Sequence, residues 1–202
     1  MNVVTVFDKV KPFFDKYRDE DHVEFEIRVG KFNCGTFDTN IGQVDFDKIM
    51  EGLRNYKGWE RIITTHEEVF YRESDNLRIS IDEQTSDEKI VQKERIHNEN
   101  FEKLDKSPFD IRFSVSKEIP IDDYEGEMDK KKTKRRVSFI RKNLSIDMTC
   151  VTGGAEDMDT EDPNSYQIEL EIIDPKLVES DNQLFNIIHK VKDLFNILDT
   201  SK

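Results

Sequence analysis

Residues 22–30 read HVEFEIRVG, and this stretch decides the expected fold of the chain. Apolar side chains occupy Val23, Phe25, Ile27 and Val29, and charged side chains occupy the positions between them. Because successive side chains of a strand point to opposite faces, this period of two predicts a β-strand. One face of that strand is apolar, and the other carries two carboxylates and one guanidinium.

Further short segments rich in β-branched and aromatic residues follow this strand. They read WERIITTHEEVFYR, NLRISID, KIVQKERI, DIRFSVSKEIPI, TKRRVSFIRKN, LSIDMTCVT and SYQIELEII. With the first strand they make about eight, and the turn-forming spacers between them favour antiparallel hairpins in a meander. Residues 153–164, GGAEDMDTEDPN, are acidic and turn-rich, which predicts an exposed loop.

Three segments have helical periodicity instead. Residues 5–18 carry apolar positions near helical spacing around Pro12, and residues 45–56 begin at an Asp. Residues 179–198 open with Ser180 and, three positions later, Gln183, which is a capping-box pattern. The combination predicts a β-rich α+β fold with helices beside the strands.

Bulk properties restrict the class of protein. At 202 residues the chain fits one domain, so residues 1–202 are expected to form a single unit. A net charge of −13 argues against a general nucleic-acid coat, double-stranded DNA and an anionic membrane surface. Cys34 and Cys150 have no metal-ligand spacing, which favours reduced thiols. Without a signal-peptide pattern or a long apolar run, we expect a cytoplasmic, non-secreted protein.

Charged residues sort by sign among the expected strands. Glu24 and Glu26 share one strand, and Glu169 and Glu171 share another. Basic residues fall on other strands, at Arg78, Lys93, Arg95, Arg112, Lys132, Lys134 and Arg136. A single strand with these charges would ordinarily turn them to water, and that alternative stays open for each strand taken alone. Sorting across the whole set favours polar faces that point into a closed barrel.

An eight-stranded barrel that holds carboxylates inside needs a compensating positive charge. Carboxylates two positions apart on a strand lie about 7 Å apart, and a second acidic strand adds repulsion. A hard divalent cation such as Mg²⁺ relieves it, and basic strands can bind the phosphate oxygens of a ligand. A barrel of this size encloses a small ligand, such as a triphosphate, while helices cover its apolar exterior.

These residues resemble the triphosphate tunnel metalloenzymes, in particular the RNA 5′-triphosphatases of fungal, protozoan and large DNA virus mRNA capping systems. The resemblance spans about residues 22–173. Its most specific part is Glu24, Glu26, Arg28 and Gly30, which is similar to the family's E-x-E-x-R-hydrophobic-G signature. The adenylate cyclase and thiamine triphosphatase branch typically has Lys where Arg28 stands.

Two further strands carry the resemblance, and one departs from it. The matching positions are Arg112, Ser114, Ser116 and Glu118 on one strand and Lys132, Lys134, Arg136, Ser138 and Phe139 on another. Gln167 stands where family members often carry Glu, ahead of Glu169 and Glu171, so a supporting contact of the acidic strand is in doubt.

The resemblance implies roles for individual residues. Glu24, Glu26 and Glu171 would bind Mg²⁺ or Mn²⁺, and Glu169 would orient the attacking water. The phosphate-contacting set would be Arg78, Lys93, Arg112, Lys134 and Arg136, with Arg136 also catalytic. The alternatives are solvated strand carboxylates and salt bridges within the tunnel wall. Arg95, Lys132, Glu118 and Asp147 also point inward by alternation and are weaker candidates.

We therefore expect hydrolysis of the γ-phosphate at the 5′-triphosphate end of nascent RNA, the first step of mRNA capping. NTPs are expected secondary substrates. The chain lacks the K-x-D-G sequence of a guanylyltransferase, which would be a partner or a further domain. A viral factory or virion is one expected location. The alternatives are a triphosphatase for tripolyphosphate or thiamine triphosphate, and a non-catalytic phosphate-binding module.

Overall fold

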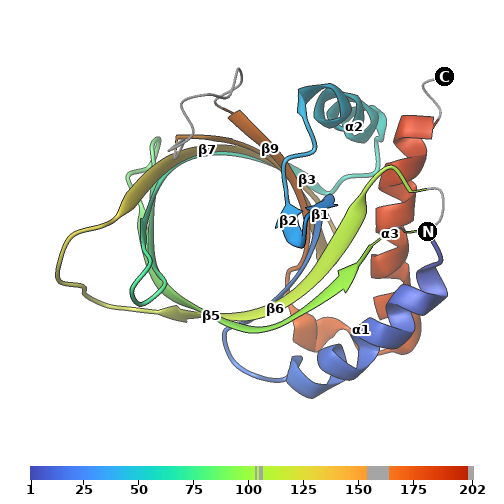
Figure 1. The fold of residues 1–202 in the computed structure, drawn as a ribbon, viewed down its shortest axis with the longest axis horizontal. Coiled ribbons are helices and arrows are strands. Elements are labelled where there is room, and N and C mark those ends of the chain that lie inside the picture. Colours follow the sequence, from blue (N-terminus) through green and yellow to red (C-terminus); the bar gives the residue numbers. More distant parts are fainter. Residues whose placement is uncertain (103, 105–106, 154–163, 200–202) are drawn as a thin grey trace.

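A computed structural model describes residues 1–202 except 103, 105–106, 154–163 and 200–202. The described chain forms a barrel of strands with helices packed against one side (Figure 1). The strands are β1 (Val23–Asn33), β2 (Thr36–Asp38), β3 (Arg61–Arg72), β4 (Leu77–Asp82), β5 (Glu88–Phe101), β6 (Asp110–Pro120), β7 (Lys130–Arg141), β8 (Leu144–Thr152) and β9 (Asn164–Ile172). The helices are α1 (Val3–Tyr17), α2 (Gln43–Asn55) and α3 (Asp181–Asp199), with a 3₁₀ turn at Pro175–Leu177.

Strand β1 closes the barrel because it pairs along both edges. The order is β1-β6-β5-β4-β3-β7-β8-β9, and β9 pairs again with β1, so eight antiparallel strands in the described chain form a closed ring. The predicted eight-stranded barrel with flanking helices is confirmed.

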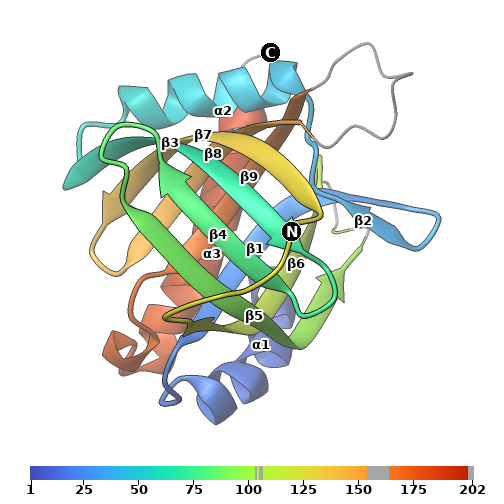
Figure 2. The ribbon, with the colours of Figure 1, turned by 90° about the vertical axis from the view of Figure 1, so that its left-hand side faces the viewer.

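The predicted meander order is wrong. Strands β3 to β6 follow one another as hairpins, but β7 returns beside β3, and β1 lies between β6 and β9. Residues 121–129 make this return outside the strands (Figure 2). The spacer compositions report only local turns, whereas closure requires that the two free edges of the sheet find partners elsewhere.

A short hairpin extends β1 beyond the barrel. Residues 31–33 pair with β2 through a turn at Cys34 and Gly35, both of which have positive φ. Phe37 folds back over Gly30, where a Cβ would lie 2.8 Å from its ring and would also collide with the Asp38 carbonyl oxygen. The glycine of the first strand is therefore required by the close approach of β2, a strand that the sequence reading did not predict.

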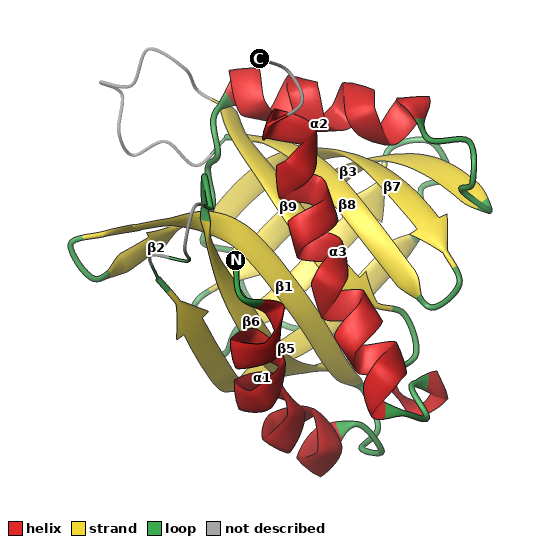
Figure 3. Ribbon diagram, turned by 90° about the vertical axis from the view of Figure 1, so that its right-hand side faces the viewer, coloured by secondary structure: helices red, strands yellow, loops and turns green. Residues whose placement is uncertain are grey.

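The apolar core lies outside the barrel, beneath the helices. Helices α1 and α3 cross the outer face of β1, β8 and β9, and α2 lies at one end (Figure 3). Fully buried side chains from the helices, such as Phe14 and Ile188, join a single cluster with Phe25 and Leu170 from the strands. The opposite side, around β4, has no helix over it (Figure 2). The expected helical cover is thus confirmed for one side only.

Local signals set the ends of two helices. Asn2 accepts hydrogen bonds from the backbone of Val4 and Thr5 and caps α1, which contains Pro12. At α3, Gln183 accepts from the Ser180 backbone, and the Gln183 backbone donates to the Ser180 hydroxyl, so the predicted capping box is confirmed. The loop predicted at 153–164 lies outside the described residues except at its two ends.

Substituting Gly30 tests the docking of the hairpin. Gly30→Ala should lower the free energy of unfolding by about 1–3 kcal/mol, because backbone must move to accept the methyl group. Gly58→Ala is the control, since its Cβ would meet only the outer ring atoms of Tyr56, an exposed side chain that can turn away. Urea unfolding compares the two variants, and equal stabilities would contradict this account of Gly30.

Candidate active site

The charged faces of the strands line the interior of the barrel. Glu26 of β1 lies opposite Ser114 of β6 on one side and Glu171 of β9 on the other. Residues directly opposite each other on paired strands share a face. Following the register around the ring places every predicted site residue on the inner face: Glu24, Glu26, Arg78, Lys93, Arg112, Lys134, Arg136, Glu169 and Glu171.

A lysine of β5 and an arginine of β1 itself engage the carboxylates of β1. Lys93 Nζ donates to Glu24 Oε2 at 2.5 Å, and Ser116 Oγ donates to the same oxygen at 3.0 Å. Arg28 Nη2 lies 2.6 Å from Glu26 Oε1, and its Nε lies 3.0 Å from Glu169 Oε1. Arg28 therefore links the acids of the first and last barrel strands.

A second group of contacts surrounds Arg136. Its Nη1 lies 3.4 Å from Asp147 Oδ2, its Nε donates to Thr149 Oγ1 at 3.2 Å, and its Nη2 lies 4.0 Å from Glu169. The buried Ser145 hydroxyl donates to Asp147 at 2.5 Å. Asp147, a weaker candidate from the sequence, is thus a buried member of the interior network.

Glu118 anchors a third group, near one end of β6. Arg78 Nη2 lies 2.5 Å from Glu118 Oε1, and Lys89 and Lys93 lie within 3.0 and 3.5 Å of this carboxylate. Although burial alone would raise the pKa of Glu118, these cations lower it to about 2. Arg78 and Lys93 therefore form salt bridges with an ionised acid of the tunnel wall. This is the role that the sequence analysis gave as the alternative to phosphate binding.

Two interior carboxyls have raised pKa values. Burial, then the charge of Glu169, raises the pKa of Glu26 to about 7. Burial, then the charges of Glu24 and Asp147, raises the pKa of Glu171 to about 8. Glu169 differs, because Arg28 and Arg136 outweigh burial and lower its pKa. The floor formed by β1 and β9 therefore carries more negative charge than its cations neutralise.

Toward the other end of the interior, the cations lack acidic partners. Arg112 Nε donates to Asn100 Oδ1 at 2.8 Å, and Lys132 and Lys134 lie 5.9 and 5.8 Å from the Tyr71 ring centroid. Within the described part of the chain, no ion pair joins these three cations or Arg95 to a carboxylate.

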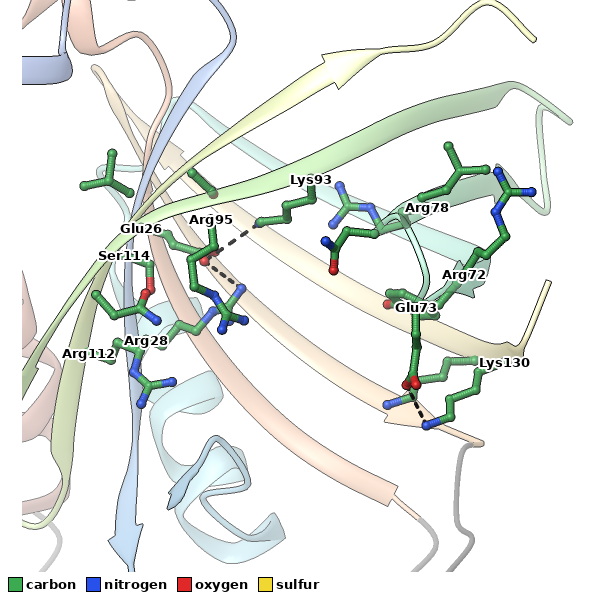
Figure 4. Close-up of a pocket in the computed structure, with 17 residues that line it drawn as sticks. Glu26, Arg28, Arg72, Glu73, Arg78, Lys93, Arg95, Arg112, Ser114 and Lys130 are labelled. Atoms are coloured by element: carbon green, nitrogen blue, oxygen red, sulfur yellow. Dashed lines mark hydrogen bonds and ion pairs between the residues drawn. The ribbon is translucent and has the colours of Figure 1, made fainter. Parts of the chain in front are cut away.

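Four of the predicted site residues, Glu26, Arg78, Lys93 and Arg112, border a cavity of about 460 Å³ (Figure 4), and its lining does not include Glu24, Lys134, Arg136, Glu169 or Glu171. Eight of its lining residues are Lys or Arg and two are Glu. The lysines and arginines are Arg28, Arg72, Arg78, Lys93, Arg95, Arg112, Lys130 and Lys132. A cavity with this excess of positive charge suits a small polyanion.

The sequence reading missed several interior residues. A bulge between Arg95 and His97 shifts the alternation of β5, so His97 stacks on Phe13 of α1, and Asn98 joins the cavity. Tyr71 and Asn76 also line it, although neither carries a charge that would draw attention. Glu67, opposite Lys134, is a further interior acid. The alternation of side chains along β3 would have predicted its position on the inner face.

No three Asp, Glu, His or Cys side chains among the described residues converge closely enough to hold one ion. The donor set nevertheless suits a hard divalent cation, because the carboxyl oxygens of Glu26 and Glu171 are opposite each other and their ionised forms are disfavoured by burial and by neighbouring carboxylates. Beside them, the buried Ser114 hydroxyl has no hydrogen-bond partner within the described residues. These residues fit a hydrated divalent metal such as Mg²⁺ or Mn²⁺.

A closed tunnel with an acidic floor and a cationic cavity defines a class of enzymes that act on triphosphates. A family model described as "mRNA capping enzyme, beta chain" matches residues 43–200. The chain belongs to this family of RNA 5′-triphosphatases, which confirms the predicted enzyme class and its place in mRNA capping. The match begins after β1, so it includes Glu169 and Glu171 and leaves out Glu24 and Glu26.

Solved structures support the fold. The S. pombe Pct1 RNA triphosphatase is 17% identical, with a TM-score of 0.78 over 96% of this chain and 92% of that one. The same protein in complex with the Spt5 CTD gives 18% identity and a TM-score of 0.74 over 94% and 92%. A search of curated proteins found no significant match. The expectation of a viral source gains no support from these comparisons.

One further finding concerns the helices. Among the described residues, no helix combines the length and apolar character that crossing a membrane requires.

The raised pKa values predict how stability depends on pH in EDTA. Protonation of Glu26 and Glu171 stabilises the fold, and this contribution is complete below their ordinary pKa of 4.5 and is lost as pH rises through 7 to 8. The free energy of unfolding should therefore fall between about pH 5.5 and pH 8.5. Glu171→Gln should flatten the slope, and Glu73→Gln at the cavity rim should keep it. Equal slopes in all three proteins would contradict the assignment.

Proposed function

We propose that the chain removes the γ-phosphate from the 5′-triphosphate end of RNA in a metal-dependent hydrolysis. Glu24, Glu26 and Glu171 hold the metal in this proposal. The observation that carries it is the opposition of two buried carboxyls, Glu26 and Glu171, whose pKa values are raised first by burial and then by neighbouring carboxylates. A divalent cation is the simplest partner that relieves this repulsion between acids on adjacent strands.

The proposed metal site draws on two strands. Glu24 and Glu26 are about 7 Å apart along β1, and Glu171 stands beside Glu26 on β9. When bound, Mg²⁺ or Mn²⁺ supplies charge neutralisation at the γ-phosphate oxygens and fixes their position. Lys93 Nζ lies 2.5 Å from Glu24 and Arg28 Nη2 lies 2.6 Å from Glu26, so these two cations fix the positions of the β1 carboxylates.

Glu169 is proposed to orient the attacking water. Its pKa is lowered by Arg28 and Arg136 against the effect of burial, so the carboxylate stays ionised at neutral pH. An ionised carboxylate accepts a hydrogen bond from the water and so points a lone pair of the water oxygen at the phosphorus. A carboxylate with a low pKa is, however, a weak base. Glu169 therefore acts through orientation rather than through early proton removal.

The basic residues divide into two groups under this proposal. Lys134, which has Glu67 opposite it, and Arg112 form no ion pair with a carboxylate among the described residues, and we assign both to direct binding of phosphate oxygens. Arg136, between Glu169 and Asp147, stabilises the charge that spreads over the transferred phosphoryl group. Arg78 and Lys93 contribute positive potential while they hold Glu118, with Lys93 also at Glu24.

Membership of the capping family favours RNA over tripolyphosphate or thiamine triphosphate as the natural substrate. NTPs are proposed as secondary substrates, since the cavity offers mostly phosphate-binding groups. The diphosphate end that results is the substrate of a guanylyltransferase, which we propose as a functional partner in the same or another chain.

Isosteric substitutions test the metal ligands. Glu26→Gln and Glu171→Gln should each lower kcat for triphosphate-ended RNA more than about a hundredfold, because loss of a ligand exceeds loss of its supporting contacts. Both variants should fold, since each removes a buried charge that repels its neighbours. Phosphate release with Mn²⁺ is the measurement, and Glu73→Gln is the matched control. Near-normal turnover in either variant would refute the assignment.

Ligand linkage tests the cationic wall without assuming a natural substrate. Mn²⁺ with tripolyphosphate should stabilise the fold by about 2.7 kcal/mol at a hundredfold excess over Kd, which raises Tm by several degrees. Arg136→Ala should shrink that shift. Lys57→Ala, an exposed change just beyond α2, should retain it. Identical shifts in the two variants would mean that Arg136 does not contact the ligand.

A further inference from the structure

Two aromatic side chains at the tunnel mouth have no part in phosphate chemistry. Phe32 continues the inner-face alternation of β1 beyond Arg28 and Gly30, and Phe37 of β2 is its direct partner. Their ring centroids are 4.9 Å apart, and both side chains are half-buried. The hairpin therefore turns an aromatic surface toward the end of the tunnel.

Arg112 extends this surface. Its guanidinium lies 4.6 Å from the Phe37 centroid and 5.7 Å from the Phe32 centroid. Burial, together with the charges of Arg95 and Arg28, lowers the pKa of Arg112, so its surroundings are short of negative charge. We name Phe32, Phe37 and Arg112 the mouth platform.

The mouth platform lies one substrate length from the acidic floor. Glu26 and Gly30 are four residues apart, or roughly 13 Å along the strand. Phe37 covers Gly30, with its ring 2.8 Å from the position that a Cβ would occupy there. A triphosphate whose γ-phosphate sits at Glu26 would bring its ribose and base to this ring.

The chemistry of the platform suits a nucleoside. Nucleobases stack on aromatic rings and on the plane of an arginine guanidinium, largely regardless of their identity. Arg112 of the platform and the nearby Arg95 both line the cavity, and neither forms an ion pair with a carboxylate among the described residues. A stacked base with an adjoining phosphate satisfies the aromatic and the cationic groups together.

We propose that the mouth platform binds the 5′-terminal nucleoside of the RNA, with its base stacked on Phe37 and Arg112 and its nearest phosphate held by Arg95 and Arg112. This inference rests on the proposed function, because the γ-phosphate must lie at Glu26. RNA then enters the tunnel from the β1–β2 hairpin end. Preference for a nucleoside triphosphate end over bare tripolyphosphate resides in this hairpin.

The test is the ratio of kcat/KM for triphosphate-ended RNA to kcat/KM for tripolyphosphate, with Mn²⁺. Phe37→Ala should lower this ratio roughly five- to hundredfold, the effect of losing one stacked base. The ratio of ATP to tripolyphosphate should fall in parallel, since ATP carries the same terminal nucleoside. Phe37→Trp should restore both ratios, whereas Phe37→Leu, which keeps bulk without an aromatic face, should not.

Phe70 provides the matched control. It is likewise half-buried and lies 5.3 Å from a lysine, Lys131, but it points away from Tyr71 and the cavity. Phe70→Ala should leave both ratios at the unmutated value. A Phe37→Ala ratio equal to that of Phe70→Ala would overturn the platform, as would a fall for RNA without a fall for ATP.

Binding without turnover gives an independent readout. Fluorescence of 2-aminopurine as the first base of triphosphate-ended RNA is measured with Mn²⁺ in a Glu169→Gln background, which prevents turnover, and it should be quenched when Phe37 is present and less after Phe37→Ala. Equal quenching would overturn the inference. Failure of the unmutated protein to hydrolyse any of the three compounds would instead refute the proposed function, so the two failures are distinct.

Discussion

Mutual repulsion among carboxylates enclosed by one barrel is the constraint on which the structure depends. Glu24 and Glu26 of β1 face Glu171 and Glu169 of β9, and water cannot fully screen charges in this interior. Arg28 bridges the two strands, and Lys93 reaches across from β5. Cations fixed on opposite strands, together with any bound metal, allow acids to be held at this density.

Because charged side chains fill the interior of the barrel, the apolar core forms between the outer face of the barrel and the helices. The buried cluster forms between the helices and the outer faces of β1, β6, β8 and β9, so packing there stabilises the strands that carry the acids. Interior positions are then free to vary in chemistry. Gln167, where the family resemblance leads us to expect Glu, donates to the Ser165 hydroxyl and lies in register with Thr149, two positions before Glu169.

The sequence predicts what depends on local alternation. The period of two in β1 and β9 places Glu26 and Glu171 on the inner face, and the Ser180–Gln183 pair marks the start of α3. It does not predict which strands become neighbours, because the turns report only adjacent segments. The bulge after Arg95 could not be predicted either, because an extra residue in one strand does not change the amino-acid composition of that strand in a recognisable way.

The two strands that form the acidic floor come from opposite ends of the chain. Glu26 pairs with Glu171, so a ribosome must complete almost the entire domain before the floor can assemble. Until β9 emerges, β1 is an unpaired edge that carries Glu24 and Glu26 without their counterparts. The acidic floor is therefore completed in a single step, when β9 joins β1, and a barrel truncated before β9 lacks half of its floor.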